Sequence, residues 1–107
     1  MIVDPDDKFF ERADAHIHLS NEQLKEIEHG RVSASMMFAL ARFNAWVNAS
    51  GFQSAEQMEA KKSEAIEYFT NEYRKMLEEN LNDYIVNFNQ YMGRNNENSS
   101  PSLKLVE

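Results

Sequence analysis

One arginine lies inside the most apolar stretch of the chain. Arg42 is the single charged residue within 32–50, and Trp46 follows it by about one helical turn. A guanidinium keeps its charge and is costly to bury without a partner, so Arg42 requires a carboxylate of its own chain or an anionic group from outside. Because buried charges are usually paired within the protein, the first alternative, with Asp14 or a glutamate as the partner, is favoured.

The second alternative is a small-molecule site around Arg42. In such a site the guanidinium holds an anionic group, and aromatic side chains form the walls of the pocket. The residues predicted to share this ligand site are Arg42, Asn44, Asn48, Trp46 and Asp14.

The histidines lie near carboxylates in the sequence but do not form a metal-binding pattern. Glu26 and His29 have the i, i+3 spacing of di-metal carboxylate bundles, but those sites need a second copy of the motif and two further carboxylates. Asp14 and His18 are one turn apart, yet His18 falls on the charged face of its helix. His16 and His18 point about 200° apart on a helix, so they cannot chelate the same ion. We therefore predict no metal site and no cofactor.

Residues for covalent catalysis are also missing from the sequence. The chain has no cysteine, no Gly-x-Ser-x-Gly elbow and no glycine-rich phosphate loop. We predict no catalytic residues, and an enzymatic function is the least favoured alternative.

Charge and composition limit the partners and the compartment. With 18 acidic and 11 basic residues the net charge is -7, which repels nucleic acid and anionic membranes. The absence of cysteine is compatible with a reducing cytoplasm, and the first residues lack the basic start and apolar run of a signal peptide. The stretch 32–50 approaches the length of a membrane span, but Arg42, Asn44 and Asn48 make insertion costly. These patterns predict a cytoplasmic protein that binds neither nucleic acid nor membrane.

The hydrophobic periodicity predicts an all-α fold with three main helices, over about 6–28, 32–50 and 54–92. Gly30 is expected to end the first helix in a left-handed conformation. The chain of 107 residues has room for one core, and no alternating pattern indicates a strand.

The domain is predicted to cover residues 1–92. The third helix is expected to open on a capping box from Ser54 to Gln57. Residues 93–107 lack periodicity and are predicted to form a flexible tail.

The helix predicted over 32–50 has two apolar faces. Large side chains, Trp46 among them, fall on one arc, and alanines fall on the opposite arc. Ala41, Ala45 and Ala49 recur at intervals of four, so another helix can approach that face closely. Two apolar faces require cover on both sides, and we expect this helix to be buried and central between the other two.

The helix predicted over 54–92 is too long for a compact chain of this size. At 1.5 Å per residue it extends about 58 Å, whereas a domain of 107 residues has a radius of gyration of about 13 Å. It therefore bends, near 80–83, or its far end packs on a second copy of the chain. Asn80 lies in its apolar stripe, a position at which a buried asparagine typically fixes register and partner choice.

Four segments of the sequence, taken together, carry a resemblance to a known family. They are Ala13–Ala15, Ser20–Gln23, Val32–Trp46 and Ala65–Tyr84. Together they resemble a family of small bacterial proteins, domain of unknown function 3144, over residues 9–92. The resemblance implies a bacterial helical protein and carries over no catalytic or ligand-binding residue.

These features predict a protein-interaction module that acts as a homodimer, through the alanine face of the second helix or the far end of the third. The residues predicted to form the interface are Ala41, Ala45, Ala49, Asn80, Tyr84 and Phe88. The alternative function is a binder of a small anionic ligand around Arg42.

Overall fold

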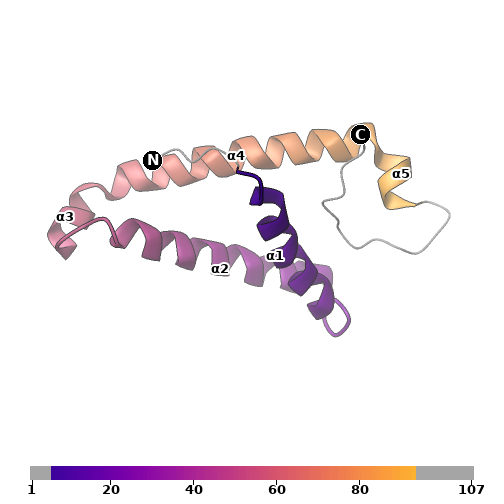
Figure 1. The fold of residues 1–107 in the computed structure, drawn as a ribbon, viewed down its shortest axis with the longest axis horizontal. Helices are drawn as coiled ribbons and strands as arrows, with labels where there is room; N and C mark the ends of the chain where they lie inside the picture. Colours follow the sequence, from indigo (N-terminus) through magenta and orange to yellow (C-terminus); the bar gives the residue numbers. More distant parts are fainter. Residues whose placement is uncertain (1–5, 94–107) are drawn as a thin grey trace. The chain divides into compact units, whose positions relative to one another are not determined.

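A computed structural model describes residues 6–93 of the chain as a succession of helices. They are α1 (Phe9–Gln23), α2 (His29–Ala49), α3 (Ala55–Ala60), α4 (Lys62–Val86) and α5 (Phe88–Met92) (Figure 1). No strand occurs among residues 6–93. The prediction of an all-α fold with three main helices is confirmed, since α1, α2 and α4 are long and the other two are short.

The helices belong to two compact units that divide within α2, between Met37 and Phe38. In the described range the first unit contains α1 and the start of α2, and the second contains the rest of α2 with α3, α4 and α5. A single domain over 1–92 stays a prediction. The predicted tail lies outside the described residues apart from Gly93, which has a φ of 55° and ends α5 in the left-handed conformation.

The first helix is shorter than predicted. It ends at Gln23 because the N–H groups of Lys25 and Glu26 donate to carbonyls three residues earlier, at 3.3 and 3.0 Å, which tightens the chain into a turn. The next helix begins at His29, so Gly30 lies in the first turn of α2. The prediction that Gly30 ends the first helix is therefore wrong.

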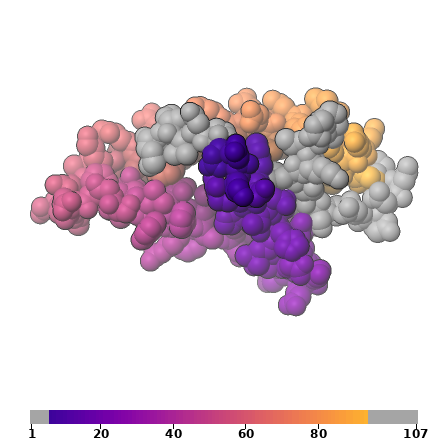
Figure 2. Space-filling model, viewed as in Figure 1, coloured from indigo at the N-terminus to yellow at the C-terminus, as the bar shows by residue number. Residues whose placement is uncertain are grey.

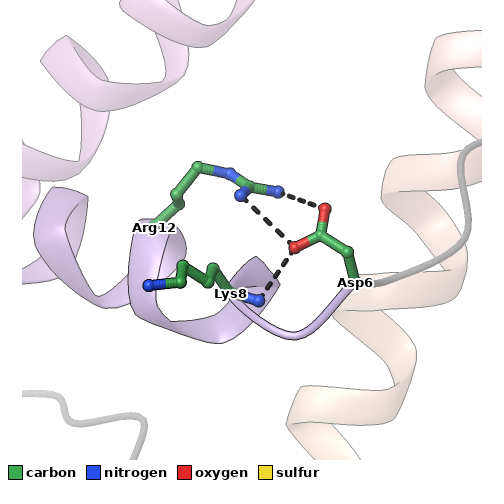
Figure 3. Close-up of polar contacts among 3 residues, drawn as sticks. All are labelled: Asp6, Lys8 and Arg12. Carbon is green, nitrogen blue, oxygen red and sulfur yellow. Dashed lines mark hydrogen bonds and ion pairs between the residues drawn. The ribbon is translucent and has the colours of Figure 1, made fainter.

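Polar contacts hold the start of α1. The Asp6 carboxylate accepts hydrogen bonds from the backbone N–H of Lys8 at 2.8 Å and from Arg12 Nη2 at 2.9 Å (Figure 3). The hydrogen bond from Arg12 and the one from Lys8 lower the pKa of Asp6, and the same carboxylate raises the pKa of Arg12. All these groups are exposed, so the contacts define the helix start and add little stability.

Ser54 caps α3, as predicted, but the reciprocal hydrogen bond of the capping box goes to the residue before the cap. Ser54 Oγ accepts a hydrogen bond from the backbone N–H of Gln57 at 3.2 Å, and the side chain of Gln57 accepts one from the N–H of Gln53 at 2.8 Å. The helix predicted to continue from here to residue 92 is divided by breaks at Lys61 and Asn87.

The break at Asn87 lies beyond the region where a bend was predicted. Helix α4 passes through 80–83 without interruption, and α5 then packs against α4. Tyr91 Oη donates to the two oxygens of the Asp83 carboxylate at 3.1 and 3.2 Å, and Asn87 Nδ2 donates to Asp83 Oδ1 at 3.0 Å. The rings of Tyr84 and Tyr91 meet edge to face at 4.8 Å. This cluster fixes the end of the chain's longest helix.

The apolar centre of the sequence is not buried. Val32, 6% exposed, is the one buried residue of the described range, and it belongs to the first unit, where Ser20 Oγ also approaches Met36 Sδ at 3.9 Å. Farther along α2, Phe38 is 70% exposed and Trp46 is 64% exposed. The expectation of a buried helix over 32–50 is therefore wrong within residues 6–93. Burial of both apolar faces would need packing partners on two sides of α2, and among the described residues most side chains of both faces stay exposed to solvent.

No helix among the described residues combines the length and the apolar character needed to cross a membrane.

Candidate functional site

An open groove runs along the second half of α2 and ends at α3. Its volume is about 660 Å³, and all of its lining residues belong to the second unit. We call it the α2 groove, and its lining residues are Phe38, Ala39, Arg42, Phe43, Ala45, Trp46, Ala49 and Met58. Figure 2 shows the surface of this stretch of the chain, from the second half of α2 to α3, in magenta to pink.

The helical repeat explains how α2 builds the α2 groove. Positions 38, 42, 45 and 49 recur at spacings of four and three, and positions 39, 43 and 46 form a neighbouring row. Arg42 lies near the middle of the two rows. The rings of Phe43 and Trp46 pack together with centroids 5.7 Å apart, and both stay more than 60% exposed. The result is an aromatic and alanine-lined surface with a cation at its centre.

Arg42 has no carboxylate partner within the described part of its unit. No acidic residue occurs in positions 29–55, so its own helix offers none. Glu72 of α4 accepts from Lys75 Nζ at 3.1 Å. The guanidinium is exposed rather than buried, so the expectation of a buried Arg42 is wrong within the described residues. Both proposed partners, a carboxylate of the chain and an anionic group from outside, stay predictions. Asp14 lies exposed on α1 in the first unit, and its pairing with Arg42 stays a prediction.

The structure brings only some of the predicted ligand residues together. Arg42 and Trp46 line the α2 groove, but Asn44 and Asn48 do not. Asn44 is two residues from Arg42, which places it about 200° around the helix, and both asparagines are half-buried. Phe38 and Phe43 line the groove and were missed as site residues, because the sequence pattern alone does not show which apolar side chains share one exposed surface.

The predicted interface residues of α2 divide in the same way. Ala45 and Ala49 line the α2 groove, whereas Ala41, one turn earlier, is exposed outside its lining. The small side chains at 45 and 49 permit close approach of another helix on this side of α2.

The predicted interface residues near the end of α4 have separate environments. Asn80 is exposed, and its Nδ2 donates to the Met76 carbonyl of its own helix at 2.7 Å, so the expectation of a buried asparagine is wrong in the described chain. Tyr84 is half-buried against Tyr91. Phe88, at the start of α5, is exposed.

A second exposed apolar surface lies on α4 and α5. It recurs at spacings of four, four and three, and it includes Ile85, which is 70% exposed. We call this surface the α4 row, and its residues are Leu77, Leu81, Ile85 and Phe88.

Several charges of the described residues pair within one turn of a helix. From the spacing of the charges in the sequence we predict solvated pairs of Lys61 with Glu64, Arg74 with Glu78 and Lys75 with Glu79. Lys61 does pair with Glu64, at 3.6 Å, but Lys75 pairs with Glu72. Within residues 6–93 neither Arg74 nor Glu78 forms an ion pair. Glu78 is therefore an unpaired carboxylate beside the α4 row.

The described residues contain no cluster of three or more histidine and carboxylate side chains that could hold a metal ion. His18 Nε2 lies 4.0 Å from Glu22 on α1, an exposed contact one turn apart.

The fold and this surface define a helical protein with exposed apolar side chains. A family model described as "Protein of unknown function (DUF3144)" matches residues 9–85, and the chain belongs to this family. The resemblance drawn from the sequence is thereby confirmed. A search of curated proteins gives no match.

A solved structure has the same fold. The chain is similar to a protein described as "NMR structure of the protein NB7890A from Shewanella sp", with 43% sequence identity and a TM-score of 0.70. The match covers 88% of this chain and 100% of that one. The helical architecture is therefore shared with a relative of known structure.

Proposed function

We propose that the protein is an interaction module that forms a homodimer through the second unit. The observation that carries this proposal is the uncovered α2 groove, in which Phe38, Phe43 and Trp46 are each more than 60% exposed around Arg42. Tryptophan and arginine are enriched in the energetic centres of protein interfaces. A bacterial origin and a cytoplasmic location stay predictions.

The exposed apolar area is of the size that a stable dimer needs. An aromatic side chain buries about 150–250 Å², so three that are about two-thirds exposed offer on the order of 400 Å². The four residues of the α4 row add a comparable area. Together they approach the roughly 800 Å² per partner of a standard interface.

A second copy of the chain is a better candidate partner for this surface than nucleic acid or an acidic membrane. The net charge of -7 disfavours nucleic acid and acidic membranes as partners of the whole molecule. The same chain also carries a second exposed apolar row, and self-complementary surfaces are the requirement of a two-fold dimer.

Light scattering coupled to size-exclusion chromatography tests the proposal. At micromolar concentration the wild-type chain is expected to elute with about twice its mass of 12.5 kDa. Phe38→Ser in the α2 groove is expected to shift the mass toward the monomer. Leu19→Ser, at an exposed position of α1, is the matched control and leaves the dimer intact. A wild-type monomer mass would overturn the proposal.

A small anionic ligand is the second candidate function. The observation that favours it is that Arg42, with no carboxylate partner in the described part of its unit, lies beside Trp46 in one groove. A thermal-shift screen against carboxylate and phosphate metabolites tests this function. A ligand that raises the melting temperature of the wild type but not of Arg42→Met supports it, and a screen with no shift contradicts it.

A further inference from the structure

The α2 groove and the α4 row share one spacing. In the groove, Arg42 is followed by small residues three and seven positions later, Ala45 and Ala49. Beside the α4 row, Glu78 is followed at the same intervals by large residues, Leu81 and Ile85. Helices that run in the same direction with Arg42 opposite Glu78 therefore place a large side chain against a small one twice.

The charges of the two surfaces are complementary. Residues 29–55 contain no acid, and the cation at the middle of the α2 groove is Arg42. On α4, Glu72 pairs with Lys75 and the Asp83 carboxylate accepts from Tyr91, whereas Glu67, Glu78 and Glu79 have no ion-pair partner within the described residues. Of these three acids, Glu78 is the one that lies one turn before Leu81. Arg42 and Glu78 are thus unpaired charges of opposite sign, and each lies three and seven positions before the residues that this register brings together.

Both surfaces belong to the second unit of a single chain. A two-fold dimer that places the groove of one copy on the row of the other forms this contact twice, because residue i meeting residue j implies the reverse. Each contact would desolvate an arginine, a tryptophan and two phenylalanines, the composition of an interface centre.

We propose that the α2 groove of one copy receives the α4 row of a second copy, with Arg42 facing the partner's Glu78. This inference rests on the proposed homodimer and adds which surfaces meet. Leu81 and Ile85 of the row then pack on Ala45 and Ala49 of the groove.

Charge reversal with complementation tests the pairing. Arg42→Glu places two acids opposite each other, and Glu78→Arg places two arginines opposite each other. Each variant alone is expected to weaken the dimer by more than about 30-fold, since like charges across an interface cost several kcal/mol. An equimolar mixture of the two is expected to restore dimerisation, because both contacts of the heterodimer then join opposite charges.

Native mass spectrometry reads the result, since the two variants differ in mass. Arg31→Glu and Glu79→Arg, exposed positions outside the two surfaces, are the matched controls and keep the dimer. Far-ultraviolet circular dichroism establishes that each variant is folded. If a variant does not fold, Arg42→Asp replaces Arg42→Glu and Glu78→Lys replaces Glu78→Arg.

The outcomes separate this inference from the proposed function. A monomeric wild type overturns both. A dimeric wild type whose single reversals stay dimeric overturns the pairing alone. Loss of the dimer in both single variants without recovery in the mixture also overturns the pairing of the groove with the row. In that case, dimers between Arg42→Glu and the wild type would indicate contact between two α2 helices.

Discussion

Arg42 and Trp46 lie one turn apart on α2 and line the same open groove, with the indole 64% exposed and the guanidinium without a carboxylate partner in the described part of its unit. In a single chain this arrangement leaves an aromatic surface and a charge to water. A second copy that covers it removes the apolar area from water and supplies the missing acid.

Replacing the tryptophan weakens self-association. Trp46→Ala is expected to cost about 2–4 kcal/mol of dimerisation free energy, because a large aromatic side chain at an interface centre is lost. Sedimentation velocity over a dilution series measures the change. Leu19→Ala, at a position of α1 that is also more than half exposed, serves as the control. Equal effects of the two substitutions would show that Trp46 has no special place in the interface.

Removing the helix cap destabilises the start of α3. Ser54→Ala is expected to lower the free energy of unfolding by about 1 kcal/mol, because the N–H of Gln57 loses its acceptor at 3.2 Å. Urea denaturation measures the change, with Ser63→Ala, an exposed serine of α4, as the control. An unchanged unfolding midpoint for Ser54→Ala contradicts the role assigned to the cap.

The tyrosine that joins α5 to α4 contributes through its hydroxyl. Tyr91→Phe removes the two contacts of 3.1 and 3.2 Å to the Asp83 carboxylate while keeping the ring against Tyr84. Hydrogen bonds to charged groups contribute about 1.5–3 kcal/mol, and partial exposure places the expected loss near the lower end. Amide hydrogen exchange of residues 88–92 measures the effect, and unchanged protection there contradicts it.

The carboxyl of Asp6 titrates below its usual range. The hydrogen bond from Arg12 and the one from Lys8 favour the charged form, so the pKa in the folded chain is depressed. The small stabilisation from this contact is therefore present above the pKa of the unfolded chain and is lost as the pH falls through the folded value. Carboxyl NMR titration measures the midpoint, which is expected to rise in Arg12→Gln. A midpoint unaffected by this substitution shows that Arg12 does not hold the carboxylate.

Helical periodicity and caps predicted the local structure of the chain well. The all-α class, the three long helices and the cap at Ser54 follow from side-chain spacing and hydrogen-bonding capacity, which are local properties. The misplaced helix end at Gly30 and the breaks at Lys61 and Asn87 reflect competition between helix and turn that periodicity does not resolve.

Burial could not be predicted in the same way. Two apolar faces on one helix indicate that cover is needed, but the pattern does not say whether the same chain or another copy supplies it. The sequence therefore predicted a buried Arg42 and a buried Asn80, whereas the described chain exposes both. The exposed aromatic residues Phe38 and Phe43 became recognisable as part of the site only once their shared groove was defined.

The molar mass of the wild-type chain in solution tests the central claim most directly. Sedimentation equilibrium at micromolar concentration is predicted to give twice the chain mass of 12.5 kDa, falling toward the monomer on dilution. A mass of 12.5 kDa that does not change with concentration would contradict the homodimer.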